Sequence, residues 1–92
     1  MSDAKSEIGR LRLQIDEVDR ELVDLLRRRV LLVVRVARLK RDLGVAVYDP
    51  ARERELVDRV PHGRVRALYQ LVVESCRRHA QAAVPRPVDD GD

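Results

Sequence analysis

The sequence predicts an all-α protein with three helices per chain, one long, one short and one of medium length, paired into an intertwined helical homodimer. Gly and Pro are absent from residues 10–43, and apolar residues recur through that stretch at helical spacing. Gly44, Pro50 and the Pro61–Gly63 segment then divide the remainder into two further helical segments. Ninety-two residues make one domain, and a chain of this size buries so little surface that a lone monomer would be marginally stable.

The first helix is expected from Glu7 to Leu43. Ser6 is the last of several candidate N-cap residues, and Gly44 is expected to end the helix because glycine tolerates a positive φ. Apolar residues alternate along this helix in steps of three and four, as in a coiled coil; this heptad seam consists of Ile8, Leu11, Ile15, Val18, Leu22, Leu25, Leu32, Val36 and Leu39. The helix would be about 55 Å long at 1.5 Å per residue. The two shorter helices cannot cover so long a stripe, so a second copy of the chain is the expected cover.

Two shorter helices follow in the sequence. Asp49 is an acidic N-cap and Pro50 occupies the first helical position, which predicts a helix that runs to about Val60. Pro61–Gly63 stops that helix, and a third helix is expected from about Arg64 to Ala83. The expected organisation is a flexible N-terminus at residues 1–6, a helical domain at residues 7–83 and a disordered tail at residues 84–92.

The composition argues against several classes of function. The aromatic residues are two tyrosines, without Phe or Trp, so the stacking surfaces of single-stranded nucleic-acid binding are missing. The longest strongly apolar run, Val30–Val34, is far too short to cross a membrane, and residues 1–10 do not resemble a signal peptide. Cys76 is the single cysteine, so no intrachain disulfide can form. We expect a cytoplasmic protein that binds neither nucleic acid nor a membrane.

The usual motifs of metal and cofactor chemistry are also missing. Two histidines and one cysteine give no zinc-ligand spacing. The sequence contains no glycine-rich phosphate loop, no nucleophile elbow and no dinucleotide fingerprint. We therefore expect a protein that uses no metal, no cofactor and no covalent intermediate.

The positive charge is concentrated in one segment. The net charge is +3 and the pI is near 9.6, and the basic residues that crowd together are Arg27, Arg28, Arg29, Arg35, Arg38, Lys40 and Arg41. A solvated helix face would account for most of them. The alternatives are a surface for a polyanion or a binding site for a small anion.

Arg29 occupies a seam position where an aliphatic residue is expected. It is either a buried polar residue that fixes coiled-coil register or a cation that points into a pocket and is paired by a ligand. Lys40 lies about 20° from Arg29 around the helix and about 16 Å along it, so two long side chains could hold a small dianion between them. Arg12 lies about 25 Å before Arg29 and about 100° around the helix. It is therefore a surface residue or, in an antiparallel dimer, a contribution to the partner's site.

The two shorter helices carry further candidates. Asp49, Arg52 and Glu53 lie at the start of the second helix, where carboxylates also suit the helix dipole without any function. The inward stripe of the third helix is expected to consist of Leu68, Leu71, Val72, Ser75, Cys76, His79 and Ala83. Within that stripe, His79 is predicted to be a half-buried histidine and Cys76 a small core residue.

These residues together resemble the small all-helical chorismate mutases of the AroQ type. The matching stretches are LRLQIDEVDRELVDLLRRR (11–29), VARLK (36–40), VYDPARERELVDRV (47–60) and, more weakly, YQLVVESC (69–76). The resemblance implies an enzyme that rearranges chorismate to prephenate on the route to phenylalanine and tyrosine. That reaction is intramolecular and needs no nucleophile or general base, only cations that hold a dianion in a compact conformation and stabilise developing charge.

The resemblance also implies roles for individual residues. Arg29 and the partner chain's Arg12 would bind the two carboxylates, and Lys40 would contact a carboxylate and the ether oxygen. Asp49 and Glu53 would hold the ring hydroxyl of the substrate, and Arg52 would complete that wall of the binding site. The third helix of such enzymes supplies a serine and, four residues later, a Gln or Glu to the ether oxygen. Direct alignment places Cys76 and Ala80 there, a shift by one places Ser75 and His79 there, and Gln81 would need another register.

Several alternatives stay open on these residues. The same fold would suit a 4-amino-4-deoxychorismate mutase, in which Glu53 would face an ammonium group, or an isochorismate-pyruvate lyase. The loop before the third helix is short. This would suit a weak mutase that is activated by a partner enzyme of the same pathway. A non-enzymatic alternative is a basic helical dimer that binds a protein or nucleic acid without catalysis. The acidic residues along the first helix argue against this alternative.

Overall fold

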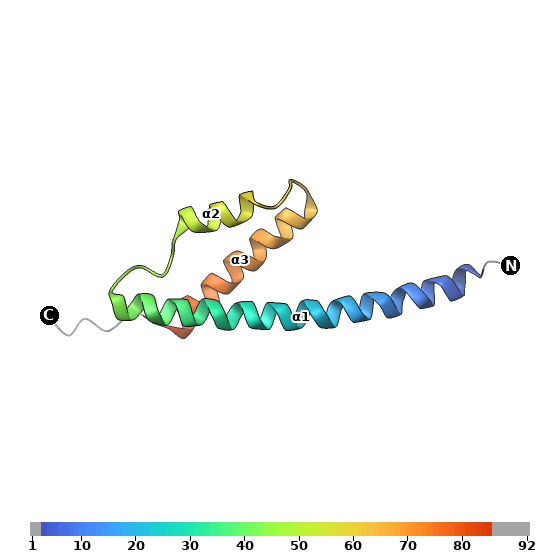
Figure 1. Ribbon diagram of the computed structural model, residues 1–92, viewed down its shortest axis with the longest axis horizontal. Coiled ribbons are helices and arrows are strands. Elements are labelled where there is room, and N and C mark those ends of the chain that lie inside the picture. Colours follow the sequence, from blue (N-terminus) through green and yellow to red (C-terminus); the bar gives the residue numbers. More distant parts are fainter. Residues whose placement is uncertain (1–2, 86–92) are drawn as a thin grey trace.

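A computed structural model describes residues 3–85, which form three helices and no strand (Figure 1). Helix α1 spans Ala4–Leu43 (40 residues), α2 spans Pro50–Asp58 (9 residues) and α3 spans Arg64–Ala83 (20 residues). The prediction of an all-α chain with one long, one short and one medium helix is confirmed. No helix within the described range is long and apolar enough to cross a membrane.

Helix α1 begins earlier than the sequence predicted. Its N-cap is Asp3, whose carboxylate accepts hydrogen bonds from the backbone N–H groups of Lys5 and Ser6 and from the Ser6 hydroxyl. The Ser6 hydroxyl, with these backbone donors, lowers the pKa of Asp3. Ser6 therefore supports the cap instead of forming it, and residues 4–6 are helical. The predicted end is confirmed, because Gly44 has φ 73° and donates to the carbonyl of Arg41.

The ends of the shorter helices follow the same local rules. The Asp49 carboxylate accepts from the backbone N–H of Arg52 at 3.0 Å, as an N-cap should. Helix α2 ends at Asp58, two residues before the predicted end, because the chain tightens into a final turn in which Val60 N–H donates to the carbonyl of Val57. The predicted bounds of α3 are confirmed.

The predicted C-terminal tail starts too early. Val84 is only 3% exposed, and its N–H donates to the carbonyl of Ala80 at 2.9 Å, so it closes the end of α3 and joins the core. Residues 86–92 of the predicted tail, like residues 1–2, lie outside the described residues.

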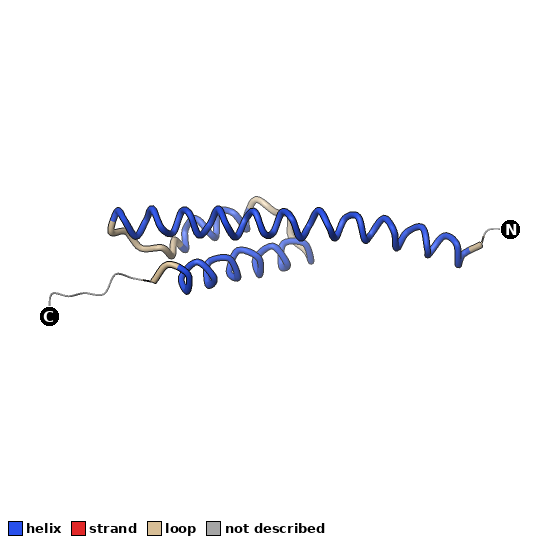
Figure 2. Tube along the Cα trace, turned by 90° about the horizontal axis from the view of Figure 1, so that it is seen from below, coloured by secondary structure: helices blue, strands red, loops and turns tan. Residues whose placement is uncertain are grey.

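Helix α3 packs against the C-terminal half of α1, and α2 packs against α3 (Figures 1 and 2). The buried core is small and is built from small side chains: Val34, Ala37, Val73, Cys76, Ala80 and Val84. Four of them, Val34, Ala37, Ala80 and Val84, form one cluster where α1 meets the end of α3. Ala37 and Ala80, at 1% and 0% exposure, allow the two helices to approach closely. The core therefore occupies only one half of the long helix.

The heptad seam of α1 is uncovered in the single chain. Its members are each between 45% and 63% exposed, and the N-terminal half of α1 extends beyond α2 and α3 (Figure 1). The radius of gyration is 19.1 Å, against about 12 Å for a compact domain of this length. A large apolar surface is thus left uncovered by the rest of residues 3–85.

Candidate functional site

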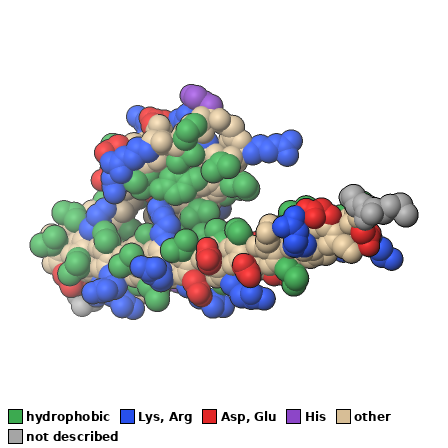
Figure 3. All heavy atoms as spheres, turned by 45° about the vertical axis from the view of Figure 1, so that its right-hand side comes forward, with side chains coloured by type: hydrophobic (Ala, Val, Ile, Leu, Met, Phe, Trp, Pro, Cys, Tyr) green, Lys and Arg blue, Asp and Glu red, His purple; other side chains and the backbone are tan. Residues whose placement is uncertain are grey.

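A cleft of about 380 Å³ lies between α1, the α1–α2 connection, α2 and α3. Its floor is apolar, and Leu32, Val33, Val36, Val47 and Val73 contribute to it. Six charged side chains line it: Arg29 and Lys40 from α1, Asp49, Arg52 and Glu53 from the start of α2, and Arg77 from α3. Figure 3 shows Lys and Arg side chains in the hollow between α1 and the two shorter helices.

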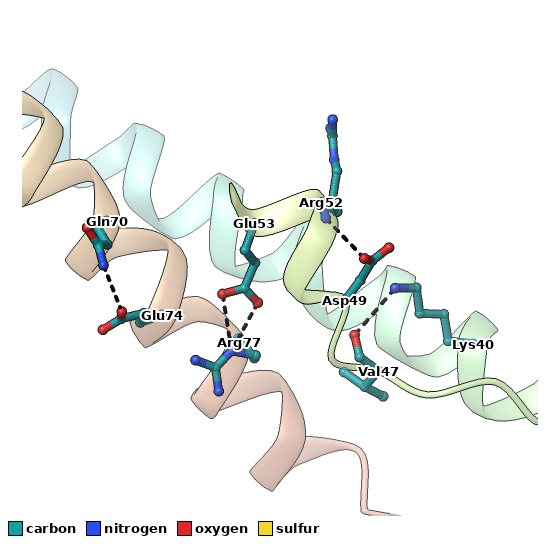
Figure 4. A network of polar contacts seen from close by, with 8 residues as sticks. All are labelled: Lys40, Val47, Asp49, Arg52, Glu53, Gln70, Glu74 and Arg77. Carbon is teal, nitrogen blue, oxygen red and sulfur yellow. Dashed lines mark hydrogen bonds and ion pairs between the residues drawn. The ribbon is translucent and has the colours of Figure 1, made fainter. Parts of the chain in front are cut away.

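The α1 cations project into this cleft together, as their spacing predicted. Each is partly buried. The Lys40 ammonium donates to the carbonyl of Val47 at 3.3 Å, which ties the end of α1 to the connection that follows it (Figure 4). The Arg29 guanidinium lies 5.8 Å from the centre of the Tyr69 ring, within range of a cation–π contact. Both cations therefore border a mostly apolar space from one wall.

The start of α2 provides the acidic part of the cleft. The N-cap position of Asp49 directs its carboxylate to the first turn of α2, where it also lines the cleft. Glu53 lies one helical turn further, and its two oxygens are 3.2 and 3.0 Å from Nε of Arg77 (Figure 4). Arg52 is about half exposed at the rim, and its side chain points away from Glu53 in Figure 4.

Arg77 is a cleft residue that the sequence reasoning missed. It lies four residues after Val73 and eight after Tyr69, and all three line the cleft. Its guanidinium also lies 4.2 Å from the centre of the Tyr48 ring. The two successive steps of four residues, from Tyr69 to Val73 and from Val73 to Arg77, are the signal that could have found it. The predicted inward stripe runs through Ser75 and His79 instead, which places Arg77 on the solvent side.

The predicted inward stripe of α3 is wrong at most of its positions. The buried residues are Val73, Cys76 and Ala80. Ser75 and His79 are exposed and line no part of the cleft of their own chain, so the alignment shifted by one residue does not bring them to it. Helix geometry explains this, because a shift of one position rotates a side chain by about 100°.

The directly aligned pair, Cys76 and Ala80, is buried, and Ala80 belongs to one core cluster with Val34 and Ala37 of α1. Neither residue lines the cleft. The prediction that Cys76 is a small core residue is confirmed. Neither register therefore places a serine or glutamine of α3 in the cleft, and Arg77 is the charged residue that α3 supplies instead.

Arg12 lies outside the cleft of its own chain. It is exposed on the N-terminal half of α1, about 25 Å along the helix from Arg29. Its contribution to a partner's site stays a prediction. The remaining candidates from α1 and α2 are brought together, since Arg29, Lys40, Asp49, Arg52 and Glu53 all line one cleft.

Residues 11–81 match the family model described as chorismate mutase type II. The chain is 36% identical over 67 residues to a 3-dehydroquinate dehydratase from Pyrobaculum aerophilum (73% of this chain, 22% of that protein). It is 36% identical over 53 residues to a chorismate mutase from Methanocaldococcus jannaschii (58% of this chain, 54% of that protein).

A further relative covers more of the chain. This is a 4-amino-4-deoxychorismate mutase from Streptomyces venezuelae, 36% identical over 83 residues, which cover 79% of this chain and 81% of that protein. The chain spans only 22% and 54% of the first two relatives. No solved structure matches it.

Proposed function

This chain belongs to the chorismate mutase type II family, and from that premise we propose that it rearranges chorismate to prephenate. The observation that carries the proposal is the charge pattern of the cleft. Four cations and two carboxylates stand over an apolar floor, which leaves a net charge of +2 opposite a substrate that carries two carboxylates. Such a site complements a small dianion both in charge and in its apolar ring.

The proposed chemistry needs positioned charges and no covalent step. The rearrangement breaks an ether bond and forms a carbon–carbon bond within one molecule, so the protein gains most by holding the substrate in a reactive conformation. Arg29 would bind a carboxylate, and Lys40 would contact a carboxylate and the ether oxygen, where negative charge develops. Cations fixed in advance beside an apolar floor stabilise that charge more than water does, because they need not reorganise.

We propose that the working form is a homodimer in which Arg12 of the partner subunit binds the second carboxylate. The uncovered seam supports this, because its apolar side chains are about half exposed in the single chain. An antiparallel partner would lay the N-terminal half of its own α1 beside the cleft. That arrangement would cover the seam and bring Arg12 of the partner subunit near Arg29.

The direct test is an assay of the purified protein with chorismate, in which loss of the chorismate absorbance is followed with time. We expect acceleration over the uncatalysed reaction, by the protein alone or with an added partner enzyme of the same pathway. A parallel assay with 4-amino-4-deoxychorismate tests the substrate that the name of the Streptomyces relative suggests. No conversion of chorismate under any of these conditions would refute the proposal.

The shared site is tested by mixing two inactive variants. Arg12→Ala and Arg29→Ala homodimers are allowed to exchange subunits, and activity is measured before and after. If each site takes Arg29 from one chain and Arg12 from the other, a mixed dimer has one intact site and activity returns. Activity that stays at the level of the separate variants would contradict the contribution of Arg12 in trans.

A further inference from the structure

The ion pair between Glu53 and Arg77 joins α2 to α3 at one end of the cleft (Figure 4). The guanidinium Nε lies 3.0 Å from one carboxylate oxygen, and each side chain is only 20% exposed. The guanidinium of Arg77 also lies over the ring of Tyr48, 4.2 Å from its centre. The pair is thus shielded from most of the solvent, unlike the exposed pair between Arg27 and Asp24.

This pair decides the charge that a substrate meets at that end of the cleft. If the proposed function holds, Glu53 is the carboxylate expected to hold the ring substituent of the substrate. With Arg77 beside it, the two charges cancel and the local site is nearly neutral. Without Arg77, Glu53 would be an unpaired carboxylate in a partly buried site, which attracts a cation and is costly to leave alone.

We propose that Arg77 is a specificity-determining residue that makes the cleft select a neutral ring hydroxyl over an ammonium group. The inference rests on the proposed function and concerns which of two related substrates the same site takes. Chorismate carries two carboxylates and a hydroxyl, whereas the 4-amino analogue adds an ammonium at the ring. An ammonium placed against Glu53 would also lie near the Arg77 cation, and like charges at close range oppose binding.

The total charge of the cleft agrees with this assignment. The lining residues carry a net +2 when Arg77 is counted and +1 when it is not. The Arg12 proposed from the partner subunit adds one to both values and leaves their difference unchanged. That difference of one charge matches the difference between doubly negative chorismate and the amino analogue, whose ammonium reduces its net charge to one negative. Arg77 therefore tunes both the local site and the whole cleft toward the hydroxyl compound.

The test compares kcat/KM for chorismate and for 4-amino-4-deoxychorismate in the wild type and in Arg77→Met. The ratio of the amino to the hydroxyl compound should rise about tenfold in Arg77→Met, as expected when one unit charge is removed a few ångströms away in a partly screened site. Arg77→Lys keeps the charge and should keep the wild-type ratio. Arg78→Met is the matched control, because Arg78 is exposed and does not line the cleft.

Two further variants guard against a purely structural effect. Arg77→Gln removes the charge but can still donate a hydrogen bond to Glu53, and it should raise the ratio even if Arg77→Met folds poorly. Adding Glu53→Gln to either variant should return the ratio toward the wild-type value, because no unpaired carboxylate is then left. Circular dichroism and size-exclusion chromatography check that each variant keeps its helices and its oligomeric state.

The outcomes separate this inference from the proposed function. A wild type that converts neither compound refutes the proposed function and the inference with it. A wild type that prefers the amino compound, or an Arg77→Met variant in which both activities fall in parallel, overturns the inference alone. A changed ratio in Arg77→Lys equal to that in Arg77→Met would also overturn it, since the charge would then not be the cause.

Discussion

The two halves of α1 have the same apolar periodicity but different surroundings. In the C-terminal half, Val34 and Ala37 are buried against α3, at 6% and 1% exposure. In the N-terminal half no described residue is buried, and Ile15 and Val18 are 56% and 60% exposed. The periodicity therefore specifies which face of the helix needs a cover but not what covers it.

The comparison also explains where the cleft lies. Ala37 is about 80° around α1 from Arg29, whereas Lys40 is about 20° from it. Helix α3 therefore packs beside the seam and leaves the seam itself open, with Arg29 and Lys40 on it. The C-terminal half can form most of a site within one chain, whereas we propose that the N-terminal half serves another chain.

The largest expected effect comes from the seam cation in the C-terminal half. Arg29→Ala should lower kcat/KM for chorismate about a thousandfold, because a fixed charge at the substrate is lost. The measurement is the chorismate assay with size-exclusion chromatography alongside, and Arg28→Ala, at an exposed position outside the cleft, is the control. If Arg29 only fixes the register of a coiled coil, the substitution should change the oligomeric state instead.

The N-terminal half is tested by a charge placed on its seam. Ile15→Asp should prevent dimer formation and remove activity, because a carboxylate cannot be buried unpaired in an apolar interface. Leu13→Asp is the matched control, since Leu13 is 66% exposed and lies on the opposite face of the same helix. Analytical ultracentrifugation gives the mass of each variant. If Ile15→Asp were dimeric and active, as its control is expected to be, the seam would not be the dimer interface.

A smaller effect is expected where α3 meets the C-terminal half. Ala80 is fully buried, so Ala80→Leu should overpack the contact and lower the free energy of unfolding by about 1–3 kcal/mol. Ala82→Leu, at an exposed position of the same helix, should leave stability nearly unchanged. Urea unfolding followed by circular dichroism measures both. Equal stability of the two variants would mean that the α1–α3 contact is looser than described.

The smallest effect concerns the side of α3 that faces away from the cleft. His79→Ala should change kcat/KM for chorismate by less than about twofold, because surface substitutions away from a site seldom matter. The measurement is the same assay, with Ser75→Ala measured alongside. A large loss in either variant would show that α3 presents this face to a site, for instance across a dimer.

Much of the fold could be read from local sequence. Gly44 ends α1 and Asp49 with Pro50 begins α2, as expected, because caps depend on the few residues around them. The predicted start of α1 is wrong because Asp3 and Ser6 are both good caps, and only the backbone N–H groups of Lys5 and Ser6 that donate to the Asp3 carboxylate show which one acts. On α1 and α2, the five candidates from Arg29 to Glu53 do line one cleft.

The third helix was the part that sequence reasoning could not resolve. Its apolar residues allow more than one inward face, since Leu68 and Leu71 are 62% and 61% exposed although they fit the predicted stripe. The face that turns inward carries Ala80, which is buried in one core cluster with Ala37 of α1, and these two residues are far apart in the chain. Arg77 lines the cleft as a result of that packing, because it lies on the face of α3 that borders the cleft.

The sequence by itself determined the three helices, the ends set by glycine and proline, and the shared face of Arg29 and Lys40, because each depends on residues within a few turns. Only the tertiary structure decided that α3 packs beside the seam instead of on it and that Arg77 meets Glu53. Those outcomes depend on the rotation of one helix against another, which small side chains at a single contact set. The periodicity of α1 therefore determines which cations share one wall of the cleft, and the packing of α3 determines which residues form the opposite wall.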